Sequence, residues 1–69
     1  MIEQKIGEIA GDVWRFIERQ GGQADLNVLR QNFRHNDGLS ADLGTGWLAR
    51  EGKVAFLNDN GGIRVQIRR

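Results

Sequence analysis

The stretch from Leu39 to Val54 reads LSADLGTGWLAREGKV and predicts a short helix that leads into a β-strand. Ser40 is a good N-cap, because its hydroxyl can accept a hydrogen bond from a free N–H group of the first helical turn. Gly52 can adopt the left-handed conformation that ends a helix, and Lys53 and Val54 then begin a strand. The remaining elements are predicted outward from this connection.

The strand at 53–58 continues into a β-hairpin. Apolar and polar residues alternate on both sides of Asn60-Gly61, and Asn-Gly is the strongest short hairpin signal. The alternation predicts a register that pairs Val54 with Ile67, Phe56 with Val65 and Asn58 with Ile63. A slip of one residue would bury arginines, so we expect strands at about 53–58 and 62–68.

Two helices are predicted upstream. Apolar residues at three- and four-residue steps predict a helix over residues 2–20, ended by Gly21-Gly22. After a short third strand expected near Gln23-Ala24, Asp25 is a predicted N-cap for a helix over residues 26–34. The segment 35–38 is then the turn before the third helix, predicted over residues 40–51.

The third helix has an unusually wide apolar arc. Leu43 and Trp47 lie outside the seam that Ala41, Thr45 and Leu48 would form on a helix. These two side chains therefore either widen the core or contact a partner. The predicted core joins the three helices and the hairpin and comprises Ile6, Ile9, Val13, Phe16, Leu29, Phe33, Leu48, Phe56 and Val65.

Three helices followed by a C-terminal β-hairpin predict an α+β fold, a winged helix-turn-helix with the hairpin as its wing. The 69 residues predict one domain, with no cysteine for a disulfide or a thiolate metal site. We expect a cytoplasmic protein, because the sequence has no signal-peptide pattern and no stretch that could span a bilayer. The net charge of +1 means that any nucleic-acid affinity must come from a local cluster of cations.

The sequence offers little for catalysis. The only histidine, His35, lies near Asp37 in a predicted turn without a nucleophile, and the chain has no cysteine or tyrosine. The segment 58–62 resembles a calcium loop but has Arg69 where the bidentate acid belongs. We therefore predict that the protein is not an enzyme and has no metal site, cofactor or small-molecule substrate.

Several runs support a family resemblance. Gly46-Trp47-Leu48-Ala49-Arg50-Glu51, Ile6-Gly7-Glu8 and Ala10-Gly11-Asp12-Val13-Trp14 resemble short bacterial and archaeal winged helix-turn-helix proteins without an assigned function. The resemblance covers nearly the whole chain. Because these residues are packing residues and glycines, the resemblance implies a fold and carries no chemistry of its own.

Two functions from different classes fit the predicted fold. The first is a role in transcription regulation through weak binding of double-stranded DNA, mainly at its phosphates. In this hypothesis the third helix enters the major groove. Asp42 opposes this hypothesis, because its carboxylate would face phosphates. The predicted DNA-contacting residues combine the cations of the second helix and wing with polar residues of the third helix: Arg30, Arg34, Ser40, Thr45, Arg50, Lys53, Arg64 and Arg68.

The alternative is a protein-interaction module that forms a homodimer or binds another protein. Its predicted interface residues are Gly7, Gly11, Trp14 and Trp47. A glycine pair one turn apart beside an indole lets a second helix approach closely, although such a pair can also simply be tolerated. Fold alone does not decide between the two functions, so the arrangement of the cations becomes the discriminating observation.

Overall fold

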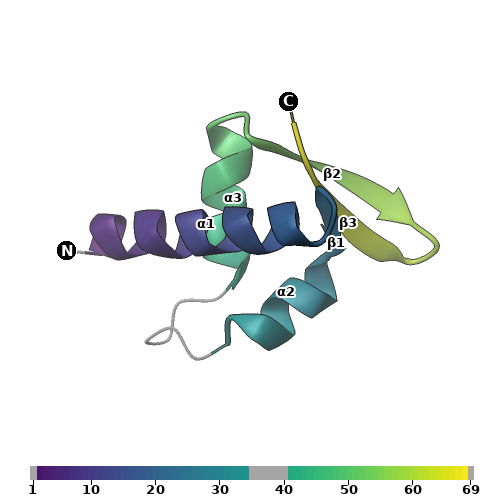
Figure 1. The fold of residues 1–69 in the computed structure, drawn as a ribbon, viewed down its shortest axis with the longest axis horizontal. Helices are drawn as coiled ribbons and strands as arrows, with labels where there is room; N and C mark the ends of the chain where they lie inside the picture. Colours follow the sequence, from purple (N-terminus) through teal and green to yellow (C-terminus); the bar gives the residue numbers. More distant parts are fainter. Residues whose placement is uncertain (1, 35–40, 69) are drawn as a thin grey trace.

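The computed structural model describes residues 2–34 and 41–68. Its helices are α1 (Ile2–Arg19), α2 (Leu26–Asn32) and α3 (Ala41–Arg50), and its strands are β1 (Gln23–Asp25), β2 (Val54–Asp59) and β3 (Gly62–Ile67). The strands form an antiparallel sheet in the order β1-β3-β2, and the three helices gather at one end of the β2–β3 hairpin (Figure 1). The predicted winged-helix architecture, including the short third strand, is confirmed.

The helix ends follow from their local sequence. In α1, the N–H groups of Gly21 and Gly22 donate to the carbonyls of Glu18 and Ile17, and both glycines have positive φ. The end of α3 repeats this Schellman pattern, because Gly52 donates to Ala49 and Lys53 donates to Leu48.

The predicted caps of the other two helices are Asp25 and Ser40. Asp25 caps α2, since its Oδ1 accepts a hydrogen bond from the N–H of Asn27 at 2.8 Å. The predicted cap Ser40 and the predicted turn 35–38 lie outside the described residues. Helix α2 ends at Asn32, earlier than the predicted Arg34, with Phe33 as its C-cap.

The hairpin has the predicted register. Val54 pairs with Ile67, Phe56 with Val65 and Asn58 with Ile63. Asn60 and Gly61 both have positive φ, as a two-residue type I′ turn requires.

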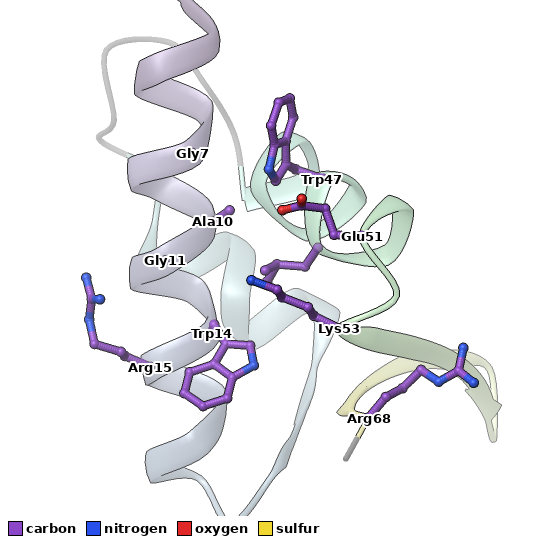
Figure 2. A pocket seen from close by; sticks show the side chains of 10 residues that line it. Gly7, Ala10, Gly11, Trp14, Arg15, Trp47, Glu51, Lys53 and Arg68 are labelled. Carbon is purple, nitrogen blue, oxygen red and sulfur yellow. The ribbon is translucent and has the colours of Figure 1, made fainter.

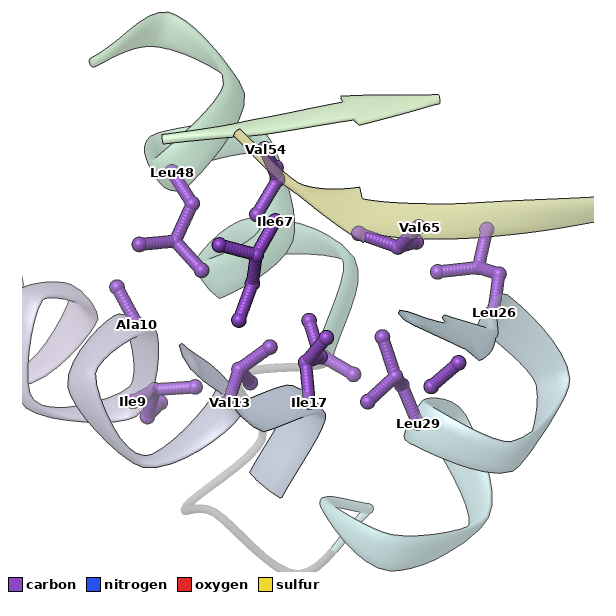
Figure 3. Packing of buried hydrophobic residues seen from close by; sticks show 12 residues of the cluster. Ile9, Ala10, Val13, Ile17, Leu26, Leu29, Leu48, Val54, Val65 and Ile67 are labelled. Carbon is purple, nitrogen blue, oxygen red and sulfur yellow. The ribbon is translucent and has the colours of Figure 1, made fainter. Parts of the chain in front are cut away.

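A single buried cluster joins all six elements (Figure 3). Val13, Ile17 and Leu29 are fully enclosed, and Val54, Val65 and Ile67 cover them from the sheet. Phe16 and Phe33 are partly buried at its margin and make an edge-to-face contact with centroids 5.8 Å apart. Within the described residues, no helix is both long and apolar enough to cross a lipid bilayer.

The prediction that Phe56 belongs to this core is wrong. Phe56 lies on the same face of the sheet as Val54, yet its side chain is 46% exposed. Phe56 instead lines an open pocket together with Ile63, Arg30 of α2 and Gly46 of α3, so the helices cover this part of the face only partly.

Candidate nucleic-acid interface

The side of α3 that faces away from the core is open. Asp42, Leu43, Gly46 and Arg50 are exposed along it, whereas Ala41, Gly44, Thr45 and Leu48 are buried on the opposite side. Leu43 is 45% exposed, so this residue does not widen the core. Trp47 is partly buried and packs against the core from the flank. The exposed side of α3 is therefore available for a partner, as a recognition helix requires.

The structure corrects the prediction that Thr45 is available to DNA. Its side chain is buried, and its Oγ1 donates a hydrogen bond to the carbonyl of Ala41 at 2.6 Å. The spacing of Ala41, Thr45 and Leu48 places all three on one side of the helix, and this spacing is the sequence signal for the burial of Thr45. Thr45 is a core residue that satisfies its hydroxyl within its own helix.

Asp42 pairs with Arg30 across the gap between α3 and α2. The guanidinium Nε donates to Oδ1 at 2.8 Å and Nη2 donates to Oδ2 at 3.0 Å, which makes the pair bidentate. The hydrogen bond from Arg30 lowers the pKa of Asp42, and the same bond raises the pKa of Arg30. Arg30 thus neutralises the acid that opposed DNA binding. Because its guanidinium is occupied by Asp42, Arg30 is less available for a phosphate.

Three predicted cations gather where α3 leads into the wing. Arg50 is exposed in the last turn of α3, and Lys53 follows after the reversal at Gly52. The N–H of Arg68 donates to the carbonyl of Lys53 at 2.9 Å, which places Arg68 directly beside Lys53. Within residues 2–34 and 41–68, none of these three side chains forms an ion pair. We call these three residues the wing-base cluster, because they are exposed and lie on neighbouring stretches of backbone.

The other predicted DNA contacts do not join this cluster. Arg34 is exposed just beyond the end of α2, and Ser40 lies outside the described residues. Arg64 is partly buried in the middle of β3, between Leu57 and Asp25 in the register of the sheet. The predicted clustering of cations on α3 and the wing is therefore limited to Arg50, Lys53 and Arg68.

The four predicted protein-interface residues line one groove between α1 and α3 (Figure 2). The groove has a volume of about 480 Å³, with Trp14 and Trp47 toward its two ends. Lys53 reaches in between the helices, while Arg15 and Arg68 extend away. Both indoles are partly buried, so each retains some exposed surface. The structure brings Gly7, Gly11, Trp14 and Trp47 together, and their role as an interface stays a prediction.

Sequence reasoning missed the glycine that matters for packing between α1 and α3. A Cβ added to Gly44 would lie 2.8 Å from Cγ2 of Ile9 and 3.2 Å from the backbone nitrogen of Ala10. A Cβ on Gly7 would meet nothing within 4 Å, and one on Gly11 would meet only the guanidinium of Arg15. The close approach of the two helices therefore depends on Gly44 and leaves the α1 glycines uncovered.

Comparison with known proteins agrees with this fold. A family model described as "Winged helix-turn-helix domain (DUF2582)" matches residues 1–67. The chain belongs to this family. It is also similar to a protein of Methanocaldococcus jannaschii, "Uncharacterized protein MJ1608", with 36% identity over 59 residues that cover 81% of this chain and 80% of that protein. No solved structure matches the chain significantly.

Proposed function

We propose that this winged-helix domain binds double-stranded DNA weakly, mainly through phosphates, and acts in transcription regulation in the cytoplasm without catalysing a reaction. The observation that carries the proposal is the wing-base cluster at the end of the open side of α3. Arg50, Lys53 and Arg68 are all exposed there, and each can offer a phosphate oxygen a charged hydrogen-bond donor. The Lys53 side chain is directed between α1 and α3, and that of Arg68 away from them (Figure 2).

The open side of α3 is compatible with entry into a DNA groove, but it offers few side chains that could distinguish one base pair from another. Its exposed residues are an acid already paired with Arg30, a leucine, a glycine and Arg50. Gly46 has nothing within 4 Å of the position where a Cβ would be, so the helix backbone can approach a DNA surface closely there. Because Arg50 is the one exposed residue of this set with free donors for a base edge, we expect affinity with little sequence preference.

Salt dependence of binding to a random-sequence duplex tests this proposal. With two or three phosphate contacts, log K should fall with log salt at a slope of roughly −2 to −3. Arg50→Ala and Arg68→Ala should each make the slope shallower by about one and weaken all sequences alike. Arg19→Ala is the matched control, because Arg19 is an exposed arginine in the last turn of α1 and does not belong to the cluster.

A second substitution pair tests the role of Arg30. Asp42→Asn should strengthen binding, since it removes a carboxylate from α3 and releases Arg30 as a further phosphate contact. Asp12→Asn changes the net charge equally and releases Arg15 from a similar exposed ion pair, but on α1. Equal effects of the two variants would indicate a response to net charge and contradict binding through α3.

Protein interaction is the second candidate, favoured by the groove between α1 and α3. Two partly buried indoles and the uncovered glycines offer apolar surface for a partner's side chains, beside the charged groups of Glu51 and Lys53. Absence of duplex binding at low salt would overturn the DNA proposal. In that case, protein interaction through this groove becomes the better account.

A further inference from the structure

The outer edge of β2 is an unprotected strand edge. Among residues 2–34 and 41–68, the sheet order β1-β3-β2 gives β2 only one neighbour, so the backbone groups on its other side have no strand partner there. Exposed edges in monomeric proteins are usually short or carry charged residues that prevent pairing with other chains. Between Val54 and Asn58 this strand has no charged residue, whereas the arginines of the wing lie at positions 64 and 68, on and just after the inner strand β3.

The hydrogen bonds of the sheet show which groups are available. The carbonyl of Lys53 accepts from Arg68 in β3, so alternate residues 53, 55, 57 and 59 point their backbone groups toward β3. The N–H of Ile67 donates away from β2, to the carbonyl of Gly22, which agrees with this alternation. The N–H and C=O groups of Val54, Phe56 and Asn58 therefore point outward from the edge.

Exposed apolar side chains accompany these groups. Phe56 and Leu57 are 46% and 45% exposed, on opposite faces of the strand. The sheet's other edge, β1, has only three residues and includes Asp25. In the part of the chain that the structure describes, β2 is thus the one edge suited to strand addition, and an interface that uses only this edge closes at two copies.

We infer that β2 pairs antiparallel with β2 of a second copy of this chain, about a two-fold axis at Phe56. Phe56 then lies opposite Phe56 of the second copy, and Val54 lies opposite Asn58. This register uses every outward-pointing group and forms about six hydrogen bonds between the chains, two for each pair. A shift of one residue would place outward groups opposite inward groups, and a shift of two would lose a pair.

Charge supports the same register. The charged residues nearest the axis are Lys53 and Asp59, three positions on either side of Phe56. In an antiparallel pair centred on Phe56, backbone position 53 of one chain stands opposite position 59 of the other, and the sequence has a lysine at the first and an aspartate at the second. Arg50 and Arg68, whose substitutions test DNA binding, lie outside β2, and the dimer and the DNA proposal can therefore fail independently.

Sedimentation velocity of the full chain, from micromolar to millimolar concentration, tests the inference. We expect a reversible monomer–dimer equilibrium that Phe56→Lys shifts by at least tenfold toward monomer, because it places two like charges on the axis. Ile63→Lys is the matched control: Ile63 lies on the same face of the sheet and is 41% exposed, but it belongs to β3 and not to the edge. The Ile63→Lys variant should dimerise as the wild-type chain does.

Hydrogen exchange of the unmodified chain gives a second test that needs no variant. The amides of Phe56 and Asn58 should become protected as concentration rises, whereas the amide of Leu57, which points to β3, should be protected throughout. A wild-type chain that stays monomeric overturns the inference, as does a dimer that leaves the Phe56 amide unprotected. A dimer abolished by Trp47→Ala but not by Phe56→Lys would place the interface in the groove between α1 and α3.

Discussion

The two halves of the wing have the same alternating pattern of apolar residues but differ in how deeply these residues are buried. Ile67 and Ile63 lie on the same strand and face, four residues apart, yet their side chains are 6% and 41% exposed. Ile67 belongs to the buried core, whereas Ile63 lines an open pocket with Arg30 of α2 and Gly46 of α3. Alternation thus decides which face of a strand is apolar, but only the packing of the helices against the sheet decides how much of that face is buried.

The largest expected difference between the halves comes from alanine substitutions of these two isoleucines. Ile67→Ala should lower the free energy of unfolding by about 2–5 kcal/mol, because it leaves a cavity in the core. Ile63→Ala should cost clearly less than Ile67→Ala, since 41% of the side chain is already exposed and its loss leaves no enclosed cavity. Chemical denaturation at low protein concentration measures both. Equal costs would show that the outer half of the wing is buried in solution.

Helix α3 likewise has a buried side and an exposed side, and alanine substitutions of its two glycines compare them. Gly44→Ala should destabilise the fold, because overpacking against Ile9 and Ala10 costs about 1–3 kcal/mol and exceeds the gain in helix propensity. Gly46→Ala, on the open side, should instead stabilise the protein by up to about 1 kcal/mol. Thermal melting by circular dichroism distinguishes the two. A stabilising Gly44→Ala would contradict the close approach of α1 and α3.

The smallest expected effect concerns the ion pair on the open side of α3. Arg30 lowers the pKa of Asp42, so the unfolded chain binds this proton more readily than the folded chain does. The pair therefore contributes stability above the ordinary aspartate pKa of about 4, and this contribution is lost as the pH falls through the lowered value. Both side chains are about half exposed, so the increment should be small.

Comparing the acid dependence of stability in wild type and Asp42→Asn measures that increment. The variant should show a slightly weaker loss of stability on acidification, and Asp12→Asn provides a comparison with the exposed pair inside α1. A steeper loss in Asp42→Asn than in wild type would mean that the carboxylate is not stabilised by Arg30. These variants also connect stability with function, because Asp42→Asn is the change expected to strengthen DNA binding.

The positions of the candidate site residues could be predicted from the sequence where the neighbouring residues are close in the chain. Arg50, Lys53 and the helix end at Gly52 lie within four positions, and their arrangement follows from a single Schellman turn. The pairing of Arg30 with Asp42 joins residues twelve positions apart on different helices. No local pattern specifies such a contact, because it depends on how α2 and α3 pack.

The sequence by itself determined the order of the elements, the glycine-ended helices, the cap at Asp25 and the register of the hairpin. Each of these depends on backbone conformations and side-chain periodicities within a few residues. Only the tertiary structure decided that Phe56 is exposed, that Gly44 forms the contact with α1, and that Asp42 faces a guanidinium. These outcomes depend on the positions of separate elements relative to one another, which local periodicity does not contain.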